Sequence, residues 1–306
     1  MSATNRSAIT IRSSAAPFAL LLAVAWLLVG GAGARAFNLT FSPGDVFISL
    51  EPGPVQWRLP DGTLNRVLVG TVPGTGEGIA LDTAGNLYVS RWCIDPWCRY
   101  SGDTVEKFNS LGQSLGRVGS GYDCAPHAIV FDAGGTAYVG QAGCTGDILK
   151  FPPGTSTPVA YAVAPDNQGS FWVDLAPDGC TMAYTSYAPN VKQFDVCAGV
   201  QLADFNRAPL PGDAQDLRIL PDGGVLVSSG DVIARLDASG VQTGIYEVAG
   251  EASWWAGLDL VGDGSFWAAN YETSNVYRFD LATGAVLGGF NAGTPAHTVV
   301  GVRVMK

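Results

Sequence analysis

Residues 76–90 read Gly-Glu-Gly-Ile-Ala-Leu-Asp-Thr-Ala-Gly-Asn-Leu-Tyr-Val-Ser, and this stretch predicts a β-hairpin. An aliphatic run at 79–81 is followed by a turn containing Gly85 and Asn86, and then by a second run at 87–90. Two such runs separated by a short Gly- and Asn-containing turn are typical of a hairpin. The pattern returns four more times, at residues 128–139, 173–185, 217–227 and 258–268.

The central apolar residue of each first strand serves as a marker of the repeat. The markers are 50, 44, 44 and 41 residues apart, in the order Ile79, Ile129, Val173, Leu217 and Leu258. After each hairpin comes a third run with a common pattern, such as Val-Tyr-Arg-Phe at 276–279, and then a fourth run. Four short strands repeated with a period in the forties indicate the blades of a β-propeller.

The two ends of the chain complete each other. Residues 45–49, 55–58 and 64–69 look like strands two to four of a blade without a first strand, whereas 298–304 looks like a first strand alone. With Val299 as its marker, this last strand lies 41 residues beyond Leu258. We therefore predict an all-β, six-bladed propeller of four-stranded blades, in which the C-terminal strand joins the N-terminal blade and removes open sheet edges.

The N-terminus has the features of a secretory signal. Arg6 and Arg12 precede an apolar run at 17–29, and the small residues that follow end in Ala-Arg-Ala at 34–36. This pattern predicts a signal peptide over 1–36 and a single propeller domain over 37–306, secreted or periplasmic; the alternative is an uncleaved membrane anchor. The formal net charge of −10 argues against a nucleic-acid surface. We expect a monomer with no membrane association after cleavage.

The six cysteines indicate disulfides in an oxidising compartment, and six allow fifteen pairings. Blade geometry selects among them. Cys124 precedes a first strand and Cys144 follows the antiparallel second, while Cys180 precedes a second strand and Cys197 follows the third. These two pairs should form within single blades, leaving Cys93 with Cys98 inside one loop.

The hairpins at 78–89 and 176–179, together with third strands such as 276–279, resemble those of NHL-type six-bladed propellers. The resemblance covers nearly all of residues 45–306 and implies the fold. That superfamily includes gluconolactonase-like hydrolases, streptogramin lyases, the peptide-amidating lyase domain and non-enzymatic binding modules, so the resemblance alone does not choose a function.

The connection into each first strand and the loop between strands two and three should emerge at one mouth of the central channel, where propellers bind ligands. Aligning the repeats places one residue per blade there: Glu77, His127, Phe171, Gln215, Ala256 and His297. Glu77, His127 and His297 would then occupy consecutive blades and predict a site for zinc or a similar divalent metal. The alternative is that each side chain only satisfies backbone groups near the channel.

Two family motifs include some of these positions. Pro126-His127 resembles the Pro-His-Gly-Leu motif of amidating lyases, whose zinc is held by three histidines, so Glu77 would replace one of them. Glu77-Gly78 matches the Glu-Gly metal motif of gluconolactonases, but the later Asn and Asp ligands of that family align with Phe171 and Gln215.

A second ring of positions lies three residues further along the inner strands and contains Asp174, Arg218 and Asp259 on successive blades. These residues could form either an ion-pair network or a substrate clamp. Aromatic residues collect in loops of the mouth face. The predicted ligand-binding residues are Trp92, Trp97, Tyr187, Arg218, Trp254 and Tyr271. We expect a small-molecule, carbohydrate or protein ligand there; the alternative function is a metal-dependent lyase or hydrolase with a His/Glu site.

Overall fold

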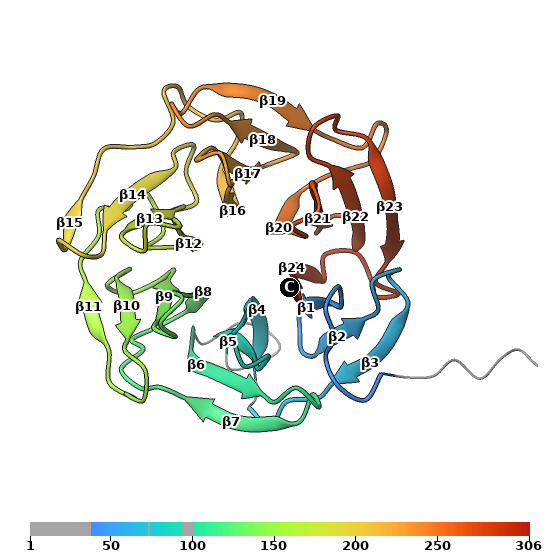
Figure 1. The fold of residues 1–306 in the computed structure, drawn as a ribbon, viewed down its shortest axis with the longest axis horizontal. Helices are drawn as coiled ribbons and strands as arrows, with labels where there is room; N and C mark the ends of the chain where they lie inside the picture. The colour runs from blue at the N-terminus through green and yellow to red at the C-terminus, as the bar shows by residue number, and fades with distance from the viewer. Residues whose placement is uncertain (1–37, 73, 94–100) are drawn as a thin grey trace, which may run out of the picture. The chain divides into compact units, whose positions relative to one another are not determined.

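The computed structural model describes residues 38–72, 74–93 and 101–306, so the expected signal peptide lies outside the described residues. Residues 37–306 form one compact unit. In the described part of this unit all regular elements are strands, arranged as six four-stranded antiparallel sheets in a ring (Figure 1). No helix there has the length and apolar character that crossing a membrane requires.

Each sheet is one blade. In five of the blades the first strand in the chain lies innermost and the fourth lies outermost. Blade 2 contains β4 (Thr75–Leu81), β5 (Leu87–Cys93), β6 (Ser101–Phe108) and β7 (Ser114–Val118). Blade 3 contains β8 (Pro126–Phe131), β9 (Ala137–Gln141), β10 (Ile148–Phe151) and β11 (Val159–Tyr161). Blade 4 contains β12 (Val173–Leu175), β13 (Thr181–Tyr184), β14 (Lys192–Asp195) and β15 (Val200–Gln201).

Blade 5 contains β16 (Ala214–Ile219), β17 (Val225–Ser229), β18 (Val232–Leu236) and β19 (Gln242–Tyr246). Blade 6 contains β20 (Trp255–Leu260), β21 (Ser265–Asn270), β22 (Asn275–Asp280) and β23 (Val286–Asn291). The closing blade joins the two ends of the chain: β24 (Val299–Val304) pairs with β1 (Val46–Leu50), followed by β2 (Val55–Arg58) and β3 (Leu64–Leu68). The predicted six-bladed fold and its closure by the C-terminal strand are confirmed.

The hydrophobic core is divided among the boundaries between blades. Six clusters of buried residues each combine side chains of two adjacent blades, and together they cover all six boundaries. At one of them, Val302 and Ile48 of the closing blade pack against Trp267 and Val276 of blade 6. Because blades rely on their neighbours to bury apolar surface, removing one strand exposes two boundaries.

The register of β24 corrects the alignment of the last repeat. Val302 pairs with Ile48 in the closing blade, just as Ile79 pairs with Val89 in blade 2. Val302, rather than Val299, therefore occupies the marker position, 44 residues beyond Leu258. The alternating valines at 299–304 fit either register in the sequence, and pairing with β1 selects one of them.

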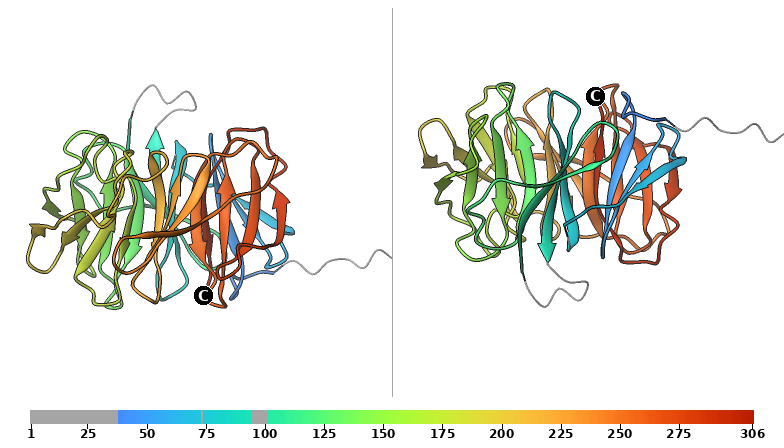
Figure 2. Two further views of the ribbon diagram at one scale, coloured as in Figure 1. Left: turned by 90° about the horizontal axis from the view of Figure 1, so that it is seen from above. Right: turned by 90° about the horizontal axis from the view of Figure 1, so that it is seen from below.

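The strands run between two faces of the ring, as the edge-on views in Figure 2 show. On one face, turns such as 82–86 and 220–224 connect strands one and two, and glycines take the positive φ values. The opposite face, here called the mouth face, carries the loops between strands two and three and the connections into the first strands. All five described non-glycine residues with positive φ lie in these mouth-face loops: Ala125, Cys144, Tyr187, Ser274 and His297.

Candidate functional site at the channel mouth

A cavity of about 290 Å³ lies at the mouth face. It is lined by one residue from each inner strand or its approach, and by side chains from the surrounding loops. The lining residues are Glu51, Glu77, Trp92, His127, Gln168, Phe171, Tyr187, Gln215, Trp254, Ala256, Tyr271 and Val300. We call this space the channel-mouth cavity.

Three members of the inner ring of lining residues are fixed by hydroxyl groups that lie on, or directly after, the second strand of the preceding blade. Ser49 Oγ donates a hydrogen bond of 2.6 Å to the carbonyl of Glu77 on the next blade. Ser90 Oγ makes the equivalent bond to the carbonyl of His127, and Thr185 Oγ1 bonds that of Gln215 at 2.6 Å. Glu77, His127 and Gln215 are thus each held by the backbone of their own blade and by a hydroxyl group of the preceding one.

Close contact between blades explains the glycine after Glu77. A Cβ at Gly78 would lie 2.0 Å from the carbonyl oxygen of His127, a distance that no side chain can occupy. Gly257 and Gly301 hold the same place in their blades, directly after Ala256 and Val300. The ring position in the closing blade is therefore Val300, and His297 does not line the cavity.

The structure brings Glu77 and His127 together and separates them from His297. Glu77 Oε1 lies 3.2 Å from His127 Nε2, whereas His297 Nε2 pairs with Glu272 Oε2 at 2.8 Å. The His297 side chain is 54% exposed and contacts the Tyr271 ring at 5.2 Å between centroids. As these side chains lie, they do not form the three-ligand metal site expected from the sequence.

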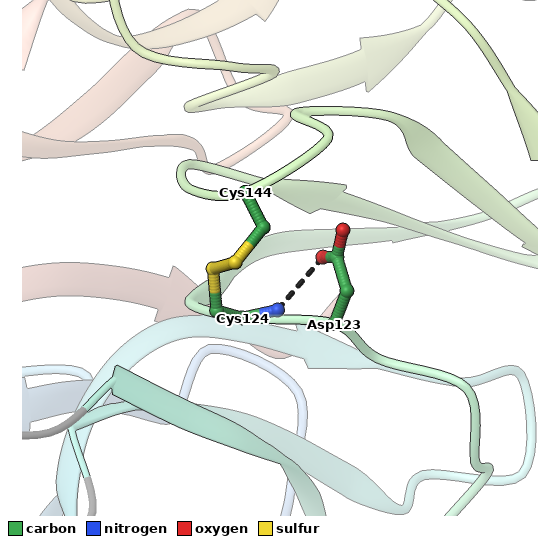
Figure 3. Close-up of side chains that lie close together, drawn as sticks. All are labelled: Asp123, Cys124 and Cys144. Atoms are coloured by element: carbon green, nitrogen blue, oxygen red, sulfur yellow. Dashed lines mark hydrogen bonds between the residues drawn. A yellow bond between two sulfur atoms is a disulfide. The ribbon is translucent and has the colours of Figure 1, made fainter.

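Within residues 38–72, 74–93 and 101–306, one group of three potential ligands converges, and it consists of Asp123, Cys124 and Cys144. Figure 3 shows that the two sulfur atoms are bonded to each other, with Asp123 Oδ1 accepting the backbone N–H of Cys124. A disulfide has no thiolate to offer a metal. This group is a structural crosslink at the mouth face.

The predicted disulfides Cys124–Cys144 and Cys180–Cys197 are confirmed, with Cα atoms 5.7 and 5.2 Å apart. The third predicted pair includes Cys98, which lies outside the described residues, and it stays a prediction. The two observed bridges indicate an oxidising environment.

Aromatic side chains form an arc around one side of the cavity. The ring centroids are 5.3 Å apart for Trp92 and His127, 3.8 Å for His127 and Phe171, and 5.4 Å for Phe171 and Tyr187. Tyr187 and Trp254 extend the series at 6.4 Å. We call Trp92, Phe171, Tyr187 and Trp254 the aromatic arc.

Of the predicted ligand-binding residues, Trp92, Tyr187, Trp254 and Tyr271 line the cavity. Trp97 lies outside the part of the chain that the structure describes. Arg218 is buried away from the cavity lining and pairs with Asp259 at 3.0 Å and Asp216 at 2.6 Å.

The corrected register extends this second ring by one member. Arg303, directly after Val302, lies 3.3 Å from Asp259, so Asp174, Arg218, Asp259 and Arg303 alternate in charge over four blades. Burial raises the pKa of Asp174 and Asp216, and the charges of Arg303 and Arg218 outweigh burial to lower the pKa of Asp259. The arrangement is a network that joins blades inside the channel.

Sequence reasoning missed Glu51 and Gln168. Glu51 follows β1 in the short loop before β2, a loop of the same class as those that supply the aromatic residues. Burial, and then the charge of Glu77, raise the pKa of Glu51. Burial and the nearby charges of Glu51 and Glu77 raise the pKa of Tyr271 to about 12, so its hydroxyl stays protonated. A search for acidic residues in these loops could have found Glu51.

Two polar atoms of lining residues have no hydrogen-bond partner among the described residues. They are His127 Nδ1 and Gln215 Nε2, on side chains that are 1% and 5% exposed. An unpaired buried polar atom costs about 1–3 kcal/mol, so each one in a native structure calls for a partner such as a water, an ion or a ligand. Tyr187, with a φ of 53°, adds backbone strain at the same cavity.

Comparisons with known proteins support the fold. No protein-family model and no curated protein sequence matches the chain. Among solved structures, a protein of unknown function from Bacteroides caccae has 14% identity and a TM-score of 0.68 over 85% of this chain and 98% of its own. The matching chain of the nidogen/laminin complex has 12% identity and a TM-score of 0.67, over 84% and 97%.

Virginiamycin B lyase from Staphylococcus aureus matches with 13% identity and a TM-score of 0.55, over 72% of this chain and 71% of its own. At such identities the similarity concerns architecture. The chain is a six-bladed β-propeller, and the fold-level resemblance to NHL-type propellers is confirmed.

Proposed function

We propose that this propeller binds a small-molecule ligand in the channel-mouth cavity. The observation that carries the proposal is the convergence, in one concave space of about 290 Å³, of the aromatic arc with the carboxylates of Glu51 and Glu77. Ligand sites in proteins combine an apolar or aromatic lining with a few polar groups in this way, and the volume suits a small ligand.

Three further features support a binding role. The unpartnered atoms of His127 and Gln215 belong to side chains of the cavity lining. The non-glycine residues with positive φ lie in mouth-face loops, as is common where loop geometry serves a site. The blade-to-blade hydrogen bonds under the ring hold it rigid, which lowers the entropic cost of binding.

A thermal-shift screen of chemically diverse fragments tests the proposal. Ala256 lines the cavity, so Ala256→Phe fills it, whereas Ala285→Phe adds the same ring at an exposed turn. We expect fragments that stabilise the wild type and Ala285→Phe but not Ala256→Phe. Fragments that stabilise all three proteins equally, or no stabilising fragment, would count against a ligand site at the mouth.

A metal-dependent lyase or hydrolase is the second candidate, favoured by the Glu77–His127 pair. The expected third ligand, His297, is engaged by Glu272, so the described residues do not fit a resident zinc ion. Elemental analysis of the purified protein separates the candidates: stoichiometric zinc supports the enzyme, and its absence supports the binding protein.

The proposal includes export. The expected signal peptide over 1–36 and the two observed disulfides both fit a secreted or periplasmic protein. Expression of the full chain in a secretory host, followed by intact-mass measurement, tests this. An exported product that retains residues 1–36 would contradict cleavage.

A further inference from the structure

We propose that the ligand of the channel-mouth cavity is an organic cation, a small amine or quaternary ammonium compound held between the aromatic arc and the carboxylates of Glu51 and Glu77. This inference rests on the proposed function and names the ligand class of the same site.

The charge of the described lining favours a cation. Glu51 and Glu77 carry carboxylates, and none of the lining residues is Lys or Arg. His127 lies beside Glu77 and can balance that carboxylate when protonated. The side chain of Glu51 has one hydrogen-bond partner among the described residues, the Tyr271 hydroxyl at 3.5 Å, which carries no positive charge.

Partial burial means that water stabilises the charge of Glu51 less well, so a cationic ligand can stabilise it instead. Glu51 is only partly exposed, and burial together with the charge of Glu77 raises its pKa. A bound cation would reverse part of this effect, because an opposite charge within a few ångströms favours the ionised carboxylate. An anionic ligand would add a further negative charge beside two carboxylates.

The aromatic arc supplies the second half of the site. Trp92, Phe171, Tyr187 and Trp254 surround one side of the cavity at centroid spacings of 5.4 to 6.4 Å between successive members. Tyr271 lies on the carboxylate side as the hydrogen-bond partner of Glu51. The negative face of an aromatic ring attracts cations within about 6 Å, most strongly for Trp, and proteins use aromatic cages to bind quaternary ammonium ligands.

Four probes of similar shape and different charge test the assignment: benzylammonium, benzyltrimethylammonium, benzyl alcohol and benzoate. Their binding to the disulfide-bonded protein is measured by isothermal titration and thermal shift, up to about 10 mM because small fragments bind weakly. We expect at least one of the two cations to bind about ten-fold more tightly than benzyl alcohol, and benzoate not to bind.

Glu51→Gln keeps the shape of the side chain and removes its charge. We expect it to weaken binding of the cation about ten-fold. The matched control is Glu247→Gln, because Glu247 is an exposed acid outside the cavity lining and its replacement makes the same change in net charge. Equal weakening in the two variants would attribute the effect to net charge and overturn the assignment.

The remaining outcomes separate this inference from the proposed function. Benzoate or benzyl alcohol could bind as tightly as the cations or more tightly, in a way that Ala256→Phe abolishes. That result would support a ligand site at the mouth and overturn the assignment of the ligand as a cation. If none of the four probes binds, the assignment of the ligand as a cation is also overturned. The proposed function itself is tested independently by the fragment screen.

Discussion

The imidazole Nε2 of His127 lies 3.2 Å from the carboxylate Oε1 of Glu77, which places a side chain of blade 3 against one of blade 2 at the channel mouth. The His127 ring also packs against Phe171 of blade 4, with ring centroids 3.8 Å apart. One residue therefore links three successive blades. The His127 ring lies between Trp92 and Phe171 of the aromatic arc.

The ring contact of His127 with Phe171 and its pairing with Glu77 can be measured separately. We expect His127→Ala to lower the free energy of unfolding by about 2–4 kcal/mol, because it leaves a cavity beside Phe171. His127→Phe keeps the ring contact and should cost less than about 1.5 kcal/mol. Urea unfolding of both variants provides the measurement. An equal loss in both would mean that the bond to Glu77, rather than ring packing, carries the stability.

Ligand binding should depend on pH through Glu51. Its pKa is raised above the ordinary value of 4.5, so the carboxylate loses its charge at a higher pH than an ordinary Glu does. Glu77, Tyr271 and, through Glu77, His127 are the titratable groups that face it. Affinity for benzyltrimethylammonium, which does not titrate, should fall as pH is lowered through this range, and Glu51→Gln should flatten that part of the profile. An unchanged profile in the variant would assign the dependence to Glu77 or His127.

Removal of Arg218 should destabilise the fold strongly. It leaves Asp216, Asp174 and Asp259 short of positive charge in the channel, so Arg218→Met should cost about 3–5 kcal/mol at neutral pH. The control is Arg235→Met, because Arg235 pairs with Asp222 at the surface and should cost less than about 1 kcal/mol.

The loss in Arg218→Met should shrink in acid. Burial already raises the pKa of Asp174 and Asp216, and loss of the neighbouring guanidinium raises it further. These two carboxylates then bind protons more readily in the folded variant than in the unfolded chain, so their contribution to stability is greatest at low pH and is lost as pH rises through the folded pKa. Urea unfolding at neutral pH and at about pH 5 measures the difference. A constant deficit would show that packing, not charge, is lost.

Deletion of residues 299–306 should abolish cooperative folding. It removes β24, and with it Val299, Val302 and Val304 from the core shared by the closing blade and blade 6. It also exposes the edge of β1, which invites aggregation. The control deletes Lys306 alone, beyond the end of β24. Light scattering and circular dichroism provide the measurements, and a soluble protein that unfolds cooperatively without β24 would contradict closure.

Each observed disulfide should stabilise the fold by about 3 kcal/mol, since the bridges span 20 and 17 residues. The predicted Cys93–Cys98 bridge closes a smaller ring and should contribute least. Double Ser variants of each pair, compared by denaturant unfolding, measure this order, and non-reducing peptide mapping establishes the third bridge. A peptide joining Cys93 to any of the other four cysteines would refute the pairing.

The sequence by itself determined the number of blades, their strand order and the two disulfides that lie within blades. Those features depend on local patterns, such as the turn after Leu81 and the period from Ile79 to Leu258, which short-range chemistry dictates. Alignment of the repeats also placed Glu77 and His127 together, because equivalent positions of adjacent blades are neighbours in space.

Only the tertiary structure decided the register of the last strand and the composition of the cavity. The valines at 299–304 fit two registers, and pairing of Val302 with Ile48 chose the one that removes His297 from the ring. The recurring glycine was the available signal, since Gly78, Gly257 and Gly301 each follow a ring residue. Glu51 joined the site because closure brings the first loop of the chain beside the last inner strand, where the Glu51 N–H bonds the Thr298 carbonyl and Val300 lines the same cavity. Local pattern does not encode this proximity.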